Sequence, residues 1–317
     1  MSPKISVLCP VYNGEARLAA AVESIRRQTE PDWELLLLDD GSRDGSAALC
    51  ARLAASDGRI RHLAHDHNRG LGAAMVTLAA AARGPYLAIQ EQDDVSAPQR
   101  LERELEILET HPEIGLVSGV AEWLDASGRR LALFPAILAA GGQYPQERRA
   151  MVRYLMLEQC KVVNAGAMFR RALLDDPAIF FDHEARMSVD WQFFLRVAHR
   201  TGIWGLPDLV VHMDRGADRG SLTRRKELQF TEARRCLRIA LETWQDDPGS
   251  PIDRRLYRHA MATQLLLEGR YYGRFLGAWR HLQAWVLDPV RREIVTSLMG
   301  LALGRWWRRP RRELSGS

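Results

Sequence analysis

The stretch Tyr86-Leu87-Ala88-Ile89-Gln90-Glu91-Gln92-Asp93-Asp94 decides how the rest of this chain is interpreted. It begins with a short apolar run of the kind found in buried strands and ends in a cluster of carboxylates. In open α/β sheets, ligands bind just beyond the carboxyl ends of such strands. Carboxylate oxygens suit a hard divalent cation, so the stretch predicts a metal and ligand site. The alternative is that Asp93 and Asp94 cap the following helix, for which Ser96 and Pro98 give start signals.

Apolar runs and polar turns alternate along the rest of the first third of the chain. Strands are expected over residues 5–9, 34–38 and 60–63, and helices over residues 15–28, around 49–54 and over 73–82. Such alternation places parallel strands side by side, with helices on both faces of the sheet. The sequence therefore predicts an α/β fold with a mostly parallel sheet.

Residues 106–225 continue this pattern with weaker signals. Strands are expected over residues 115–120, 131–134, 162–169 and 206–211, and a helix over residues 148–158. Residues 136–146 are rich in Gly, Ala and Pro, and we expect them to form a loop. A loop near an active rim acts either as a lid or as a passive connector.

Three loops that follow expected strands carry polar side chains. They are Tyr12-Asn13, Asp39-Asp40-Gly41-Ser42 and Glu91-Gln92-Asp93-Asp94, and on a parallel sheet they share one rim. An aromatic ring can stack on a nucleobase, a carboxylate can accept a base N–H, and an acidic cluster can hold a metal against a diphosphate. No dinucleotide fingerprint follows the first strand and no P-loop motif is present, so a metal is expected to neutralise the phosphates. Each loop also has a plain structural interpretation, as a turn or as a half-buried aromatic at the rim.

Read in order, these motifs resemble the nucleotide-sugar-binding half of family 2 inverting glycosyltransferases with the GT-A fold. The motifs are Pro10-Val11-Tyr12-Asn13, Gln28-Thr29, the run from Asp39 to Gly45, Asn68-Arg69-Gly70, the run from Glu91 to Asp94, and Pro98 with Arg100-Leu101. The resemblance covers about residues 4–105 and continues more loosely to about residue 225. It implies a Rossmann-like GT-A sheet with flanking helices, a nucleoside-diphosphate-sugar donor (a UDP-sugar first), and Mg²⁺ or Mn²⁺ as cofactor.

The resemblance also implies a set of donor-binding residues. They are Pro10, Tyr12, Asn13, Asp39, Asp40, Asn68, Arg69, Glu91, Gln92 and Asp93. Tyr12 and Asp40 would lie near the base with Asp39 close by, and Asp93 would bind the metal through the diphosphate. The family usually has Asp at the position of Glu91, so the role of this longer side chain stays open.

Asp190 is the candidate catalytic base. Trp191, Phe194 and Leu195 form an apolar helical stripe, which places Asp190 at or near the N-terminus of a helix. The helix dipole keeps a carboxylate ionised there, as a group that accepts a proton from a sugar hydroxyl requires. A plain N-cap aspartate is the alternative. The resemblance assigns the base to Asp190, although Val189 stands where relatives commonly have an acidic residue.

A histidine or an arginine is expected to assist at the end of the strand over residues 206–211. Many relatives have a histidine hereabouts that helps with the metal or the diphosphate. Either His212 is that residue, or Arg215 takes its place and contacts phosphate directly. His212 at a strand end also fits a purely structural role.

Beyond residue 225 the sequence is helical. Helices are expected over residues 228–244, 253–267, 275–286 and 291–307. We therefore predict a glycosyltransferase domain over residues 1–225, with a donor half over about 1–105 and an acceptor half over about 106–225, and a helical region over 226–317. The arginines and tryptophans from residue 305 onward fit an anchor on an anionic membrane surface. The alternative is a packed helix with a solvated basic tail.

Composition limits the remaining classes of partner and location. The formal net charge is only +4 and its excess is local, so no nucleic-acid partner is expected. The four cysteines are scattered and form no C-x-x-C pair, which argues against a zinc site and a disulfide framework. No secretory signal or spanning segment is visible, which predicts a cytoplasmic protein, peripheral at the inner membrane face if the tail binds there.

The sequence thus predicts a metal-dependent inverting glycosyltransferase of cell-surface polysaccharide synthesis. Its acceptor would be a hydroxyl of a glycan or a lipid-linked saccharide. Two alternatives stay open: a catalytically silent module that binds nucleotide-sugars, which Glu91 and Val189 make conceivable, and a nucleotidyltransferase, which would normally show an early glycine-rich phosphate loop.

Overall fold

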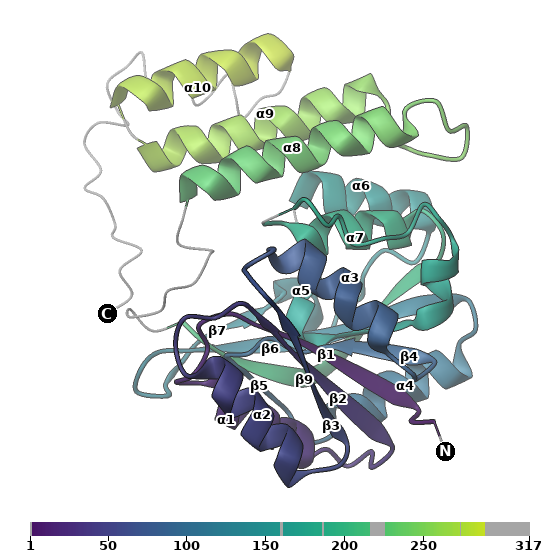
Figure 1. Cartoon of the computed structure of the whole chain (residues 1–317). Helices are drawn as coiled ribbons and strands as arrows, with labels where there is room; N and C mark the ends of the chain where they lie inside the picture. The colour runs from purple at the N-terminus through teal and green to yellow at the C-terminus, as the bar shows by residue number, and fades with distance from the viewer. Residues whose placement is uncertain (1, 159–160, 186, 216–225, 273, 289–317) are drawn as a thin grey trace. The chain divides into compact units, whose positions relative to one another are not determined.

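The computed structural model describes residues 2–158, 161–185, 187–215, 226–272 and 274–288 (Figure 1). The chain divides into two compact units, Met1–Arg224 and Arg225–Ser317. The first unit contains the strands, and the described part of the second is helical.

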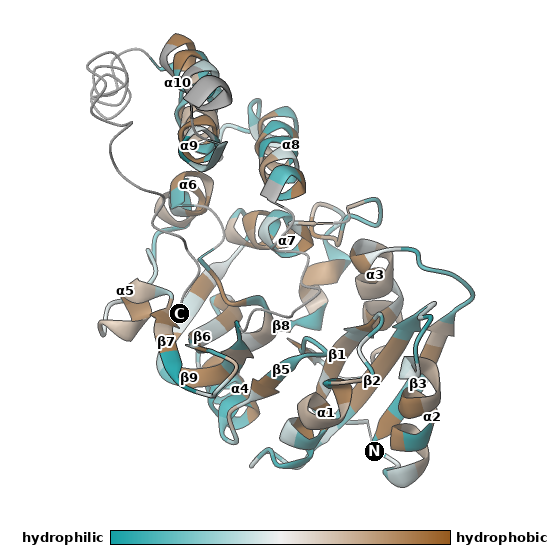
Figure 2. Ribbon diagram, turned by 90° about the vertical axis from the view of Figure 1, so that its left-hand side faces the viewer, coloured by the Kyte–Doolittle hydropathy of each residue, from teal (hydrophilic) through white to brown (hydrophobic). Residues whose placement is uncertain are grey.

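The first unit is built on one sheet with the strand order β3-β2-β1-β4-β8-β6-β9-β5, and β7 pairs with β6. The strands β1 (Ile5–Val11), β2 (Trp33–Asp40), β3 (Ile60–His65) and β4 (Tyr86–Ile89) are parallel, as predicted. Their apolar runs are buried because helices cover both faces. In Figures 1 and 2, α1 (Leu18–Arg26) and α2 (Ser46–Ser56) lie on one side of these strands and α3 (Leu71–Ala81) on the other.

The other half of the sheet is mixed. The strands there are β5 (Asp94–Ser96), β6 (Ile114–Leu124), β7 (Arg130–Phe134), β8 (Ala167–Arg170) and β9 (Gly202–Asp214). β6 and β9 are parallel, whereas β8 runs antiparallel to both β4 and β6, and β5 and β7 are antiparallel edge pairings. The sequence predicts a mostly parallel sheet, and the antiparallel pairings beyond β4 are those of β5, β7 and β8, because an apolar run does not encode the direction in which the chain returns.

Several segments of this half differ from the prediction. The expected loop over residues 136–146 begins with a short helix, α5 (Ala136–Ala139), whereas α6 (Arg148–Glu158) matches the expected helix. The expected strand over residues 162–169 starts with the 3₁₀ turn η1 (Asn164–Gly166), so β8 begins only at Ala167. The unit also contains α4 (Arg100–Thr110), η2 (Arg171–Asp175) and α7 (Val189–Ala198).

The second unit contains α8 (Lys226–Trp244), α9 (Arg254–Tyr272) and α10 (Arg274–Leu287). Glu268 of α9 is buried and forms ion pairs with Arg234 of α8 and Arg280 of α10. Arg280 Nη2 lies 3.0 Å from Glu268 Oε1. One carboxylate therefore connects α8, α9 and α10. None of the described helices has the length and apolar character needed to cross a membrane. The helix expected over residues 291–307 and the basic tail lie outside the described residues.

Candidate active site

The acidic stretch forms a tight turn between β4 and β5. Glu91, Asp93 and Asp94 each place one carboxylate oxygen within 4.8 Å of the other two. Carboxylate oxygens at this spacing match the preference of Mg²⁺ and Mn²⁺ for hard oxygen ligands. The chemistry of the turn therefore fits the divalent cation that the sequence predicts.

Glu91 shows which other residues reach this turn. Its Oε1 accepts a hydrogen bond from Asn164 Nδ2 at 2.9 Å. Burial raises the pKa of Glu91, and the negative charges of Asp93 and Asp190 raise it further, whereas the hydrogen bond from Asn164 and the charge of Arg215 lower it. Residues far apart in the sequence are thus brought within electrostatic range of the acidic turn. Asp190, the predicted base, is one of them.

Asp190 lies in the first turn of α7, as predicted. The helix that carries it is firmly fixed, because Trp191 Nε1 donates to the carbonyl of Leu155 at 3.0 Å. Phe193 stacks on Phe181 with ring centroids 4.2 Å apart. The N-terminal end of the helix dipole favours the ionised carboxylate at this position.

The three loops that were predicted to share one edge of the sheet lie side by side and are joined by hydrogen bonds. Gln92 connects the acidic turn to the loop after β1, since Tyr12 N donates to Gln92 Oε1 at 2.9 Å and Gln92 Nε2 donates to Tyr12 O at 3.1 Å. Asn13 connects that loop to the next, because its Oδ1 accepts from Arg43 N at 2.9 Å. Pro10 belongs to β1 itself. The ring of Tyr12 is 40% exposed and available for stacking.

Asp39 and Asp40 point to opposite faces of β2 and have different surroundings. Both carboxylate oxygens of Asp40 have partners. Oδ1 lies 2.6 Å from His65 Nδ1 and accepts a hydrogen bond from Arg69 N. Oδ2 accepts from Asn68 Nδ2 and from Gly70 N. Asp39 Oδ2 accepts from Ser42 N at 3.3 Å, whereas its buried Oδ1 has no hydrogen-bond partner among the described residues. Asp40 therefore holds the loop over residues 68–70, whereas one oxygen of Asp39 has no hydrogen-bond partner among the described residues.

His212 lies in β9 and contacts a carboxylate outside the acidic turn. Its Nδ1 lies 2.8 Å from Glu122 Oε2 on the neighbouring strand β6. In the pairing of β9 with β5, His212 stands opposite Val95, next to the pair of Met213 with Asp94. The role of His212 as a metal ligand stays a prediction.

Arg215, the alternative to His212, follows the end of β9. Its guanidinium lies over the ring of Trp123, 4.9 Å from the ring centroid, and its Nη2 is 3.5 Å from Met213 Sδ. Among the described residues, no carboxylate oxygen lies within ion-pair distance of this guanidinium. Its charge lowers the pKa of Glu91. A cation near the acidic turn, with no carboxylate partner among the described residues, suits an anionic ligand.

The sequence interpretation did not include Asn164 in the site. The available signal was a single amide inside a run of apolar residues, which we assigned to a strand. The 3₁₀ turn η1 directs this side chain to Glu91.

Comparison with known proteins identifies the family. Residues 6–176, more than half of the chain, match the model of glycosyl transferase family 2. This chain belongs to that family. The prediction from the ordered motifs is thereby confirmed.

Curated relatives of this glycosyltransferase family match part of the chain. The putative glycosyltransferase EpsE of Bacillus subtilis is 36% identical over 142 residues, which are 44% of this chain and 51% of EpsE. The uncharacterized glycosyltransferase EpsJ of the same organism is 30% identical over 203 residues, 62% of this chain and 56% of EpsJ. The chain thus spans about half the length of these two relatives. The UDP-Glc:alpha-D-GlcNAc-diphosphoundecaprenol beta-1,3-glucosyltransferase WfgD of Escherichia coli is 32% identical over 104 residues, 33% of this chain and 40% of WfgD.

Solved structures share the fold. S. aureus TarS 1–349 in complex with UDP-GlcNAc superposes with a TM-score of 0.65 and 15% identity, covering 95% of this chain and 87% of that one. The mannosyltransferase PcManGT from Pyrobaculum calidifontis, in complex with GDP-Man and Mn²⁺, superposes with a TM-score of 0.59 and 18% identity, covering 98% and 89%. The predicted GT-A fold is confirmed, in the form of a mixed sheet with flanking helices.

Proposed function

We propose that this chain is an inverting glycosyltransferase that uses a nucleoside-diphosphate-sugar, a UDP-sugar first, together with Mn²⁺ or Mg²⁺. One observation carries the proposal: Asp190 and the cation Arg215 both lie within electrostatic range of the acidic turn around Glu91. A base, a cation and a set of metal ligands at one place are what the transfer of a sugar from a diphosphate requires.

The donor would lie across the rim of the sheet. Tyr12 would stack on the base, because its side chain is exposed. Asp39 Oδ1 would accept a base N–H, because it has no hydrogen-bond partner among the described residues. Arg215 would contact the diphosphate. Asp93, with Glu91 and Asp94, would hold a divalent cation, which when bound neutralises charge on the diphosphate. The UDP-GlcNAc and the Mn²⁺ named for two fold relatives support this assignment.

Asp190 would act as the general base. Its carboxylate accepts the proton of an acceptor hydroxyl as that oxygen attacks the anomeric carbon of the donor. The new glycosidic C–O bond forms on one face of the sugar while the bond to the diphosphate oxygen breaks on the other, which inverts the anomeric configuration. The electron pair of the breaking bond leaves with the nucleoside diphosphate, whose charge Arg215 offsets.

The acceptor would be a hydroxyl of a glycan or of a lipid-linked saccharide. The name of WfgD includes a diphosphoundecaprenol-linked sugar, which supports this class. In this proposal residues 106–225 form the acceptor half, and the protein works at the cytoplasmic face of an anionic membrane.

Calorimetric titration with a panel of nucleoside diphosphates and their sugars, with Mn²⁺ and with EDTA, tests the donor part of the proposal. We expect one nucleotide-sugar to bind only with the metal, and Asp93→Ala to lose that metal dependence. Binding of the donor without either transfer or hydrolysis would support the silent module that the residues Glu91 and Val189 make conceivable. Binding of no nucleotide by the wild-type protein would contradict the proposal.

A further inference from the structure

The side chain of Gln90 is buried beneath the acidic turn, with 1% of its surface exposed. Its Nε2 donates to the carbonyl oxygen of Glu91 at 2.9 Å and to that of Asp94 at 2.7 Å. One amide group therefore ties together the first and last residues of the segment that carries the three carboxylates.

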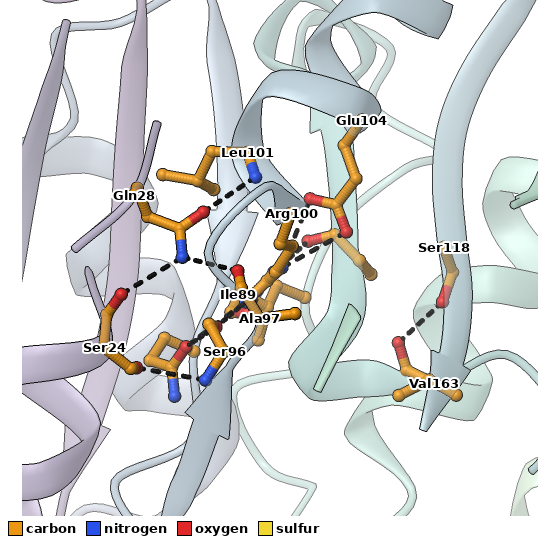
Figure 3. Close-up of polar contacts among 12 residues, drawn as sticks. Ser24, Gln28, Ile89, Ser96, Ala97, Arg100, Leu101, Glu104, Ser118 and Val163 are labelled. Carbon is orange, nitrogen blue, oxygen red and sulfur yellow. Dashed lines mark hydrogen bonds and ion pairs between the residues drawn. The ribbon is translucent and has the colours of Figure 1, made fainter. Parts of the chain in front are cut away.

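The orientation of this amide is fixed by its other end. Gln90 Oε1 accepts from Ser96 Oγ at 2.6 Å and from Arg100 Nη1 at 3.2 Å, so the oxygen and nitrogen cannot exchange places without losing the contacts with Arg100 and with both carbonyls. Arg100 is 1% exposed, donates to the carbonyl of Ile89 at 2.7 Å, and is neutralised by Glu104 at 3.2 Å. Figure 3 shows Arg100 between Ile89, Ser96 and Glu104.

We propose that Gln90 is a positioning residue for the metal and donor site. Three carboxylates within 4.8 Å of one another repel, and a turn without support would relax by moving them apart. The hydrogen bonds of Gln90 hold the backbone of Glu91 and Asp94, and so hold their carboxylates near Asp93 before any ligand arrives. A site organised during folding loses less free energy when its ligand binds. This inference rests on the proposed function, because it assumes metal-dependent donor binding at this turn.

Gln90→Met removes all four hydrogen bonds while nearly keeping the side-chain volume. Gln28 offers a matched control, since it is a second buried glutamine: its Nε2 donates to Ser24 O at 3.1 Å and Ala97 O at 2.8 Å, and its Oε1 accepts from Leu101 N at 2.9 Å (Figure 3). Gln28→Met therefore removes contacts of the same kind, in the same layer, without touching the acidic turn.

The measurements are calorimetric titration of UDP-sugar with Mn²⁺, titration of Mn²⁺ alone by electron paramagnetic resonance, and thermal unfolding of the apoprotein. We expect both variants to lower the unfolding temperature. Only Gln90→Met should weaken the affinity for Mn²⁺ and for the donor, by about 10- to 100-fold, the range found when residues that orient metal ligands are replaced. Gln28→Met should stay within about twofold of wild type, since it leaves those ligands in place.

Gln90→Glu is the second variant if Gln90→Met does not fold. It keeps the shape of the side chain and its contacts to Ser96 and Arg100, but places an oxygen against the two carbonyls, and we expect the same loss of affinity. If the wild-type protein binds the donor with Mn²⁺ and the Gln90 and Gln28 variants bind alike, the inference is wrong. If the wild-type protein shows no metal-dependent binding, the proposed function fails, and the role of Gln90 fails with it.

Discussion

The buried ion pair between Arg100 and Glu104 gives the sharpest prediction about stability. Both side chains have no exposed surface, and the guanidinium also donates to the carbonyl of Ile89 and to Gln90 and Ser96. Replacing Arg100 with Met leaves the Glu104 carboxyl in the core without its partner. Removal of one member of a buried pair typically costs about 3–5 kcal/mol, because the other charge stays desolvated.

The double variant separates the charge effect from the loss of packing. Arg100→Met combined with Glu104→Leu removes both charges. The double variant still loses the hydrogen bonds that Arg100 donates around Gln90, which should lower the free energy of unfolding by about 1–3 kcal/mol in all. Each single variant should therefore be less stable than the double variant. For a unit of this size the single variants should unfold roughly 6–20 °C below wild type, at about 2–4 °C per kcal/mol.

Urea unfolding of the four proteins, followed by tryptophan fluorescence, measures this cycle at a pH above about 7, where Glu104 is ionised in the folded wild type. We expect the destabilisation of the double variant to be smaller than the sum of the two single values by at least about 3 kcal/mol. Additive losses would refute the reasoning, since they would mean that the two charges do not compensate each other in the core.

Other substitutions test the site and its supports. Asp190→Asn should lower the transfer rate by about 10²- to 10⁴-fold with donor affinity unchanged, and single-turnover kinetics beside calorimetry would check both; normal turnover would exclude Asp190 as the base. Arg215→Met should weaken binding of UDP more than binding of uridine, and equal losses would argue against a phosphate contact. Gly72→Ala should destabilise the protein, because a Cβ there would lie 1.9 Å from a backbone oxygen, whereas Gly58→Ala meets nothing within 4 Å and is the control in thermal unfolding. Burial raises the pKa of Glu104 to about 7 from 4.5. The folded state therefore binds this proton more tightly, so stability should fall by up to about 3 kcal/mol as the pH rises from about 4.5 through 7, and Glu104→Leu should abolish that slope in urea titrations at several pH values.

The sequence was most informative where function depends on strand ends. Apolar runs followed by Tyr12-Asn13, Asp39-Asp40 and the stretch from Glu91 to Asp94 predicted strands and polar loops in the right order. Parallel strands align their carboxyl ends, so three loops distant in sequence had to meet along one edge. For this reason the order of the strands and rim loops in this half followed from local pattern, and the family followed from the resemblance of those loops to known motifs.

Local pattern could not decide which member of a neighbouring pair reaches the site. Asp39 and Asp40 look equivalent in sequence, but β2 directs them to opposite faces, and Asp40 is taken up by the loop over residues 68–70. His212 and Arg215 are likewise separated by the fold, because His212 lies within β9 against Glu122, whereas Arg215 follows the strand and lies over the ring of Trp123. Such choices depend on strand register, which tertiary contacts fix.

By itself, the sequence determined most of the strands and helices, the shared rim, the acidic turn and the place of Asp190 in the first turn of a helix. Each of these follows from interactions between residues close together in the chain, or from the common geometry of parallel strands. Only the tertiary structure decided that the second half of the sheet is mixed, that Asn164 donates to Glu91, that the charge of Arg215 acts on Glu91, and that the amide of Gln90 contacts both ends of the turn. These features depend on the direction in which distant segments return to the sheet, and no short stretch of sequence contains that information.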